Sequence, residues 1–128
     1  MIQESSPLKA AAELMRLFGV ATLLVTRDPP RTSEAVGVIS DRDLVLTAMV
    51  RGDLLRTVRV CDAMTSGLPS VRLGTDLHDA FEIMRCKGLR RLLVTRTAPD
   101  DKQIAGFLCI DDVVDALASA LPMRAAKY

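Results

Sequence analysis

The stretch Leu23-Leu24-Val25-Thr26-Arg27 occurs a second time as Leu92-Leu93-Val94-Thr95-Arg96. The similarity around it extends without a gap over residues 8–45 and 77–114, at a constant offset of 69, and more than a third of the aligned positions are identical. A solenoid generally needs three or more shorter units. We therefore interpret the chain as two copies of one α/β unit, related by a pseudo-twofold axis with a cleft between the halves.

Each copy begins with apolar residues at helical spacing, which predicts an amphipathic helix. Gly19 and Gly88 follow these helices at the position where a left-handed C-cap is favoured. Before the helices, the pairs Ser6-Pro7 and Thr75-Asp76 are suitable N-caps. The apolar positions are Leu8, Ala11, Ala12, Met15 and Phe18 in the first copy, and Leu77, Ala80, Phe81 and Met84 in the second.

Near-continuous apolar runs at 20–25 and 89–94 predict strands buried on both faces. Each is followed by a polar loop, a second strand (35–40 or 104–109) and a second helix from Asp41 or Asp111. Short strands are also expected at 57–60 and 69–73. The counterpart of the latter would fall on residues 1–3, so we expect the first strand of the first copy to be almost absent. The predicted repeats are 1–56 and 57–121, with a tail at 122–128.

Composition excludes several classes of function. The 17 basic and 16 acidic residues nearly cancel and only four residues are aromatic, which argues against nucleic-acid binding. No apolar run approaches the roughly 20 residues of a membrane span, and no signal peptide is recognisable, so we expect a cytoplasmic protein without membrane contact. The three cysteines, which indicate neither a disulfide framework nor a zinc site, are predicted to be buried.

The turn Gly37-Val38-Ile39-Ser40-Asp41-Arg42-Asp43 joins a strand to a helix and carries a hydroxyl and a carboxylate three residues apart. Unpaired N–H groups at the helix N-terminus, together with Ser40, could bind phosphate. Asp43 could accept hydrogen bonds from the two ribose hydroxyls. The alternative is that Ser-x-x-Asp here is only a helix cap. The sequence leaves both interpretations open.

The second copy departs from this pattern. Asp112 keeps the position of Asp43, but Cys109 replaces the hydroxyl and is a weaker hydrogen-bonding group. Arg90 and Arg91 come directly before Leu92–Val94, the wholly apolar part of the second copy's predicted strand. Their guanidinium groups could bind phosphate oxygens or could be ordinary solvated charges. We expect one full-strength site rather than two.

The order β-α-β-β-α in tandem, with GVISDRDL, VRVCDAMTSGLPSV and GFLCIDDV, resembles a pair of CBS domains, the Bateman module. The resemblance implies two small sheets packed face to face with helices outside, and a regulatory module that is not an enzyme. It implies binding of an adenosine nucleotide between the repeats, AMP, ADP or ATP rather than S-adenosylmethionine or NAD, with magnesium only alongside ATP. No cofactor is obligatory. The implied ligand-binding residues are Ser40, Arg42, Asp43, Arg90, Arg91, Cys109 and Asp112.

The residues themselves also argue against catalysis, because no nucleophile is matched to a base, and the single His78 has no evident partner. An effector protein is expected but not identifiable. The second helices are expected to form a homodimer through apolar faces, and a ligand-free homodimerisation module is the alternative function. Those faces consist of Leu44, Leu46, Met49 and Val50, and of Val113, Val114, Leu117 and Leu121.

Overall fold

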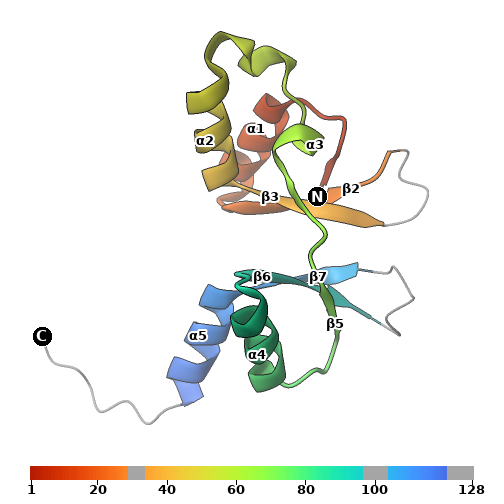
Figure 1. The fold of residues 1–128 in the computed structure, drawn as a ribbon, viewed down its shortest axis with the longest axis vertical. Coiled ribbons are helices and arrows are strands. Elements are labelled where there is room, and N and C mark those ends of the chain that lie inside the picture. Colours follow the sequence, from red (N-terminus) through yellow and green to blue (C-terminus); the bar gives the residue numbers. More distant parts are fainter. Residues whose placement is uncertain (29–33, 97–103, 121–128) are drawn as a thin grey trace, which may run out of the picture. The chain divides into compact units, whose positions relative to one another are not determined.

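The computed structural model describes residues 1–28, 34–96 and 104–120 and contains the predicted unit twice (Figure 1). One compact unit extends from the N-terminus to Leu68 and the other begins at Pro69. Both follow the order β-α-β-β-α, so the mixed α/β prediction is confirmed. The elements are β1 (Ile2–Gln3), α1 (Leu8–Phe18), β2 (Thr22–Thr26), β3 (Ala35–Ser40) and α2 (Asp41–Arg51), then β5 (Ser70–Arg72), α4 (Leu77–Lys87), β6 (Arg91–Thr95), β7 (Ile104–Cys109) and α5 (Ile110–Ala120).

Between α2 and β5 the chain forms the 3-10 helix η1 (Gly52–Thr57), the short helix α3 (Val60–Ala63) and the strand β4 (Thr65–Ser66). The predicted strand at 57–60 is therefore wrong. The reason is local: the Arg59 backbone N–H donates to Asp62 Oδ2 at 3.0 Å, which starts a helical turn instead. β4 joins the first sheet in the order β1-β2-β3-β4, while the second sheet is β5-β6-β7.

The first strand is present, which corrects the expectation that it is almost absent. Ile2 in β1 pairs with Val25, and Val71 in β5 pairs with Val94, so the two strands have the same parallel register at the offset of 69. The Thr26 and Thr95 hydroxyls donate to the carbonyls of Ile2 and Val71, each at 3.4 Å. The strand β1 has two residues and its counterpart β5 has three, so the two strands are nearly equal in length.

Each unit has its own apolar core beneath its helices. Met15 and Met84 are buried as predicted, but Phe18 is 68% exposed and Met49 81% exposed, so neither belongs to a core. Cys61 and Cys86 are also exposed, contrary to prediction. The first core consists of Ile2, Leu8, Ala11, Met15, Leu23, Val25, Ile39, Val58 and Val60, and the second of Ala80, Met84, Leu92 and Val113.

The helix ends agree with the sequence at their C-termini and differ at their N-termini. Gly19 and Gly88 are both left-handed, with φ of 63°. At the start of α1, however, Pro7 is the N-cap and no side chain caps the helix, so Ser6 is not the cap. At the start of α4 the carboxylate of Asp76, the second member of the predicted pair, accepts from the His78 N–H at 2.9 Å.

Candidate functional site

The turn from β3 into α2 holds Ser40 and Asp43 in a complete capping box. The Ser40 N–H and hydroxyl both donate to Asp43 Oδ2, at 2.8 and 2.9 Å, and the Asp43 N–H donates to Ser40 Oγ at 3.2 Å. Ser40 is only 3% exposed. The capping role of Ser-x-x-Asp is therefore real, and it leaves Asp43 Oδ1 outside the box.

The first amides of α2 are engaged, which corrects the expectation of unpaired N–H groups there. The Asp41 N–H donates to the carbonyl of Ala21 at 2.9 Å, and the Arg42 N–H donates to Asp41 Oδ1 at 2.8 Å. The third amide, that of Asp43, is bonded to Ser40. An incoming phosphate would have to displace these partners, so side chains rather than helix amides are the available phosphate ligands in this turn.

Two polar groups of the turn remain accessible. Arg42 is exposed and lies one residue before Asp43, whose side chain is half-buried. A carboxylate oxygen beside a cation suits a ligand that presents a hydroxyl pair close to a negative charge. The turn thus combines a hydrogen-bond acceptor with a cation.

Gly37 takes part in the geometry of this turn in a way that the sequence did not reveal. It pairs with Ser66 of β4, and a Cβ at Gly37 would collide with the carbonyl oxygen of Thr65. At the equivalent Gly106 an added Cβ meets nothing within 4 Å. The strand β4 can therefore pair with β3 at this distance only because residue 37 has no side chain.

The equivalent turn in the second unit keeps half of the capping box. The Cys109 N–H donates to Asp112 Oδ2 at 3.0 Å, matching the bond from Ser40 to Asp43. The Ile110 N–H donates to the carbonyl of Arg90 at 2.8 Å, as Asp41 does to Ala21. The reciprocal bond depends on a side-chain oxygen, which Cys109 lacks.

Arg91 and Cys109 lie together in the second unit. Burial raises the pKa of the Cys109 thiol, and the neighbouring Arg91 guanidinium offsets this only in part. Arg91 is half-buried, whereas Arg90 is exposed. Two guanidinium groups, a thiol and the Asp112 carboxylate thus occupy positions that are Ala21, Thr22, Ser40 and Asp43 in the first unit.

Metal ligands do not gather anywhere in residues 1–28, 34–96 and 104–120, where no group of three His, Cys, Asp or Glu side chains could hold an ion. The pair Asp100-Asp101 lies outside the described residues. Within the same described ranges, no helix combines the length and apolar character needed to cross a membrane.

The family model of the CBS domain matches residues 60–119. A signal-transduction protein with CBS domains from Burkholderia ambifaria superimposes on the chain with a TM-score of 0.77 at 20% identity, covering 98% of this chain and 87% of that one. Residues 60–119 therefore match a CBS domain, and the chain as a whole has the fold of CBS-domain proteins. The family model covers the second CBS repeat, and the similar structure extends the same fold over the first.

Two further proteins are similar to this chain. CBSX2, whose structure was solved in complex with AMP, has a TM-score of 0.71 at 29% identity, over 94% of this chain and 87% of that one. An uncharacterized protein of Methanopyrus kandleri is 26% identical over 112 residues, which are 85% of this chain and 54% of that protein. The chain thus spans about half of the length of this curated relative.

The two units of this chain carry unequal polar groups at equivalent turns. The first has the Ser40 hydroxyl, the half-buried Asp43 carboxylate and the exposed Arg42. The second has a carboxylate, a thiol with a raised pKa and two guanidinium groups. Among the predicted site residues, hydrogen bonds join Ser40 to Asp43 and Cys109 to Asp112, and Arg91 lies beside Cys109.

Proposed function

We propose that this CBS protein is a regulatory module that binds an adenosine nucleotide, AMP, ADP or ATP, and passes its occupancy to an effector protein. The observation that carries the proposal is the Ser40–Asp43 turn, in which one carboxylate oxygen is held by the cap and the other, Oδ1, takes no part in it. The solved complex of the related CBSX2 with AMP supports the choice of ligand.

Asp43 is proposed to bind the ribose. A carboxylate accepts hydrogen bonds only, and the two neighbouring ribose hydroxyls are donors, so the two match without any change of protonation. Because Oδ2 is held at 2.8 Å by the Ser40 N–H, the carboxylate is oriented before the ligand arrives. Such preorganisation reduces the entropy that binding would otherwise cost.

The phosphate is proposed to bind side-chain cations, because the first amides of α2 already have partners. Arg42 is exposed next to the ribose-binding carboxylate in the first repeat. In the second repeat Arg90 and Arg91 stand at the positions that Ala21 and Thr22 occupy in the first. Two additional positive charges are therefore proposed to attract the phosphate there. Guanidinium groups can bond two phosphate oxygens at once.

The first experiment is thermal unfolding of the protein with AMP, ADP, ATP with and without magnesium, NAD and S-adenosylmethionine, with GTP as the control. A ligand at about a hundred times its dissociation constant stabilises the folded state by ~2.7 kcal/mol, which raises the melting temperature by several degrees in a domain of this size. The absence of a shift with every adenosine compound would contradict the proposal.

The site is then tested by calorimetric titration of Asp43→Asn with the best ligand. Asparagine keeps an oxygen for the Ser40 N–H but loses the charged acceptor, and hydrogen bonds to charged groups are worth about 1.5–3 kcal/mol, so affinity should fall at least about tenfold. Asp41→Asn, which alters an exposed carboxylate two residues earlier, is the matched control and should bind as the wild type does. Equal affinity of Asp43→Asn and wild type would place the ligand elsewhere.

A ligand-free homodimerisation module is the second candidate, and the exposed apolar face of α2 favours it. Met49 and Val50 are each 81% exposed, and Leu46 lies on the same helix with about half of its surface exposed. Two residues predicted for the dimer faces do not fit: Leu44 packs against the first core and Val113 is fully buried in the second. Leu121 lies outside the described residues.

Sedimentation velocity separates the two candidates. If α2 forms a dimer, Met49→Glu should shift the protein to the monomer, because burying an unpaired carboxylate is costly. Leu17→Glu, at an equally exposed apolar position on α1, should not. A dimer that binds no adenosine compound would support the scaffold function, whereas unchanged association in Met49→Glu would exclude this face as the interface.

A further inference from the structure

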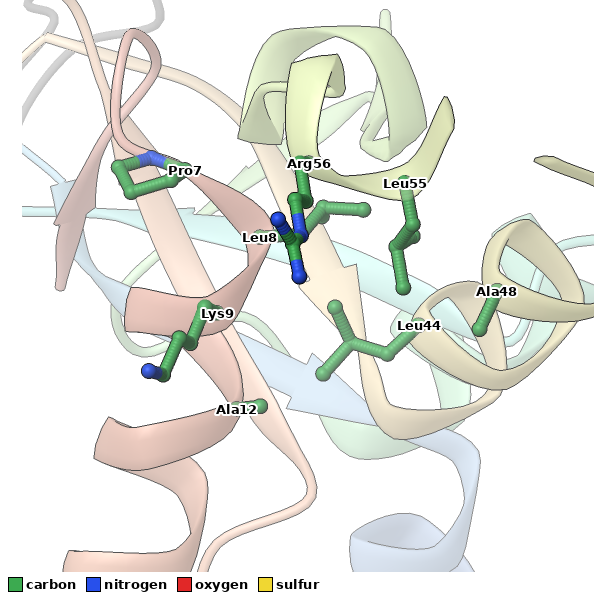
Figure 2. Close-up of a pocket in the computed structure, with 8 residues that line it drawn as sticks. All are labelled: Pro7, Leu8, Lys9, Ala12, Leu44, Ala48, Leu55 and Arg56. Atoms are coloured by element: carbon green, nitrogen blue, oxygen red, sulfur yellow. The ribbon is translucent and has the colours of Figure 1, made fainter. Parts of the chain in front are cut away.

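A cavity of about 500 Å³ lies between α1, α2 and η1 in the first unit (Figure 2). We call it the α1–α2 pocket. It contains neither Ser40 nor Asp43, so it is distinct from the proposed nucleotide site. Its apolar lining residues are Pro7, Leu8, Ala12, Leu44, Ala48 and Leu55.

The pocket has the size and lining of a small-molecule site. Ligand pockets usually enclose about 300–1,000 Å³ and combine apolar walls with a small number of polar groups. A water molecule needs two or more polar partners, which leucine and alanine side chains cannot supply. The apolar walls therefore favour an apolar occupant over water.

The charged residues that line the pocket, Lys9 and Arg56, are both cations. Figure 2 shows the Arg56 guanidinium directed into the space between Leu8 and Leu44. Among the described residues, the side chain of Arg56 makes no hydrogen bond or ion pair. Lys9 lies 3.9 Å from Glu13, but both side chains are mostly exposed, so this pair is weak.

The start of α1 adds to this positive potential. The N-cap Pro7, together with Leu8 and Lys9 of the first turn of α1, lies on one side of the pocket, and no acidic residue lies in that turn. The partial positive charge of a helix N-terminus is thus not neutralised by a side chain of its own turn. Apolar walls with a positive rim match a molecule that has an apolar body and one negative group.

We propose that the α1–α2 pocket binds a small amphiphilic anion, such as a medium-chain carboxylate. Its apolar chain lies against Leu44, Ala48 and Leu55, and its carboxylate is bound by Arg56. A cationic amphiphile is disfavoured by Arg56, and a free nucleotide would bring more polar surface than these walls can satisfy.

Calorimetric titration with octanoate and decanoate tests the proposal, with decanol and decyltrimethylammonium as charge controls. Each added methylene buried in the pocket should strengthen binding by up to about fourfold, so decanoate should bind about tenfold more tightly than octanoate. Decanol should bind more weakly than decanoate, and the cation should not bind. No binding of decanoate, or equal binding of the cation, would overturn the proposal.

Two variants test whether decanoate binds in the α1–α2 pocket. Ala48→Phe fills the pocket and should abolish decanoate binding, whereas Ala118→Phe, on an exposed position of α5, should leave it unchanged. Arg56→Gln, whose exposed side chain can be changed without altering a core, should lower decanoate affinity but leave decanol affinity unchanged. Binding of decanoate that survives both pocket variants would overturn the proposal.

Sedimentation velocity of the same proteins tests whether a second copy of the chain occupies the pocket instead. If Ala48→Phe disrupts association of the wild-type protein while decanoate does not bind, the pocket receives a second copy of the chain and the proposal is wrong. AMP titration of Ala48→Phe should match the wild type, because Asp43 is unaltered, so the two proposed sites can fail independently.

Discussion

Ser40 donates twice to one oxygen of Asp43: its N–H lies 2.8 Å and its hydroxyl 2.9 Å from Oδ2. The Asp43 N–H returns a bond of 3.2 Å to Ser40 Oγ. The pair therefore caps α2 whatever else it binds, and any nucleotide must use the acceptor capacity that the cap leaves free.

Ser40→Ala should lower the free energy of unfolding by ~1 kcal/mol, because loss of a serine N-cap typically costs about 0.5–2 kcal/mol. Urea denaturation of the unliganded protein measures it. Ser119→Ala, at an exposed serine inside α5, is the control and should change stability little. An unaltered midpoint for Ser40→Ala would mean that the capping box does not stabilise α2.

Cys109→Ser should stabilise the second repeat by up to ~1 kcal/mol, because a hydroxyl at this position can accept from the Asp112 N–H and complete the box. The Cys109 N–H already donates to Asp112 Oδ2 at 3.0 Å, so the backbone geometry is in place. The same denaturation series checks it. Ser40→Cys, the reverse exchange in the first repeat, should lower the free energy of unfolding. An increase in the free energy of unfolding in both variants would contradict the capping explanation.

Stability should fall at alkaline pH because of Cys109. Burial raises the pKa of this thiol, so the folded protein retains its proton at a pH where the unfolded chain has begun to lose it. Unfolding then releases a proton, and the contribution present at neutral pH is lost as the pH rises past the ordinary thiol pKa. Urea midpoints between about pH 8 and about pH 10 should decline more steeply for wild type than for Cys109→Ser. Parallel declines would exclude the thiol as a cause.

Gly37→Ala should destabilise the protein by about 1–3 kcal/mol, because the new methyl group would force β4 away from the position where Thr65 now lies. Gly106→Ala is the matched control: the added methyl meets nothing, and the loss of glycine's freedom in the unfolded chain should make it neutral or slightly stabilising. The denaturation midpoints of the two variants should be measured side by side. Equal midpoints would contradict the close approach of the Thr65 carbonyl to Gly37.

Ile2→Ala should cost about 2–4 kcal/mol, because Ile2 is buried in the first core beside β2. Gln3→Ala, the exposed neighbour in the same two-residue strand, should have little effect. Thermal unfolding of both variants provides the measurement. A negligible effect of Ile2→Ala would mean that β1 contributes nothing to the core.

Local patterns predicted the strands β3 and β7 to the residue, because the alternation of apolar residues and the following helix start are properties of adjacent positions. They were wrong where a side-chain hydrogen bond or the packing of neighbouring elements decides. The 57–60 segment was predicted as a strand, but the Asp62 carboxylate accepts from the Arg59 N–H and starts a helical turn. Phe18 has the helical spacing of a core residue, but it is 68% exposed.

The sequence by itself predicted the duplication and the order of elements in each unit. Its constant offset of 69 relates equivalent residues, as the pairs Ile2–Val25 and Val71–Val94 show. Tertiary structure decided what those side chains are free to do. The Ala21 carbonyl accepts a hydrogen bond from the Asp41 N–H, and the Thr65 carbonyl lies against Gly37. The helices α1, α2 and η1 surround a cavity that Arg56 lines. These outcomes depend on atoms far apart in the chain, whose approach depends on packing and is not encoded in any local period.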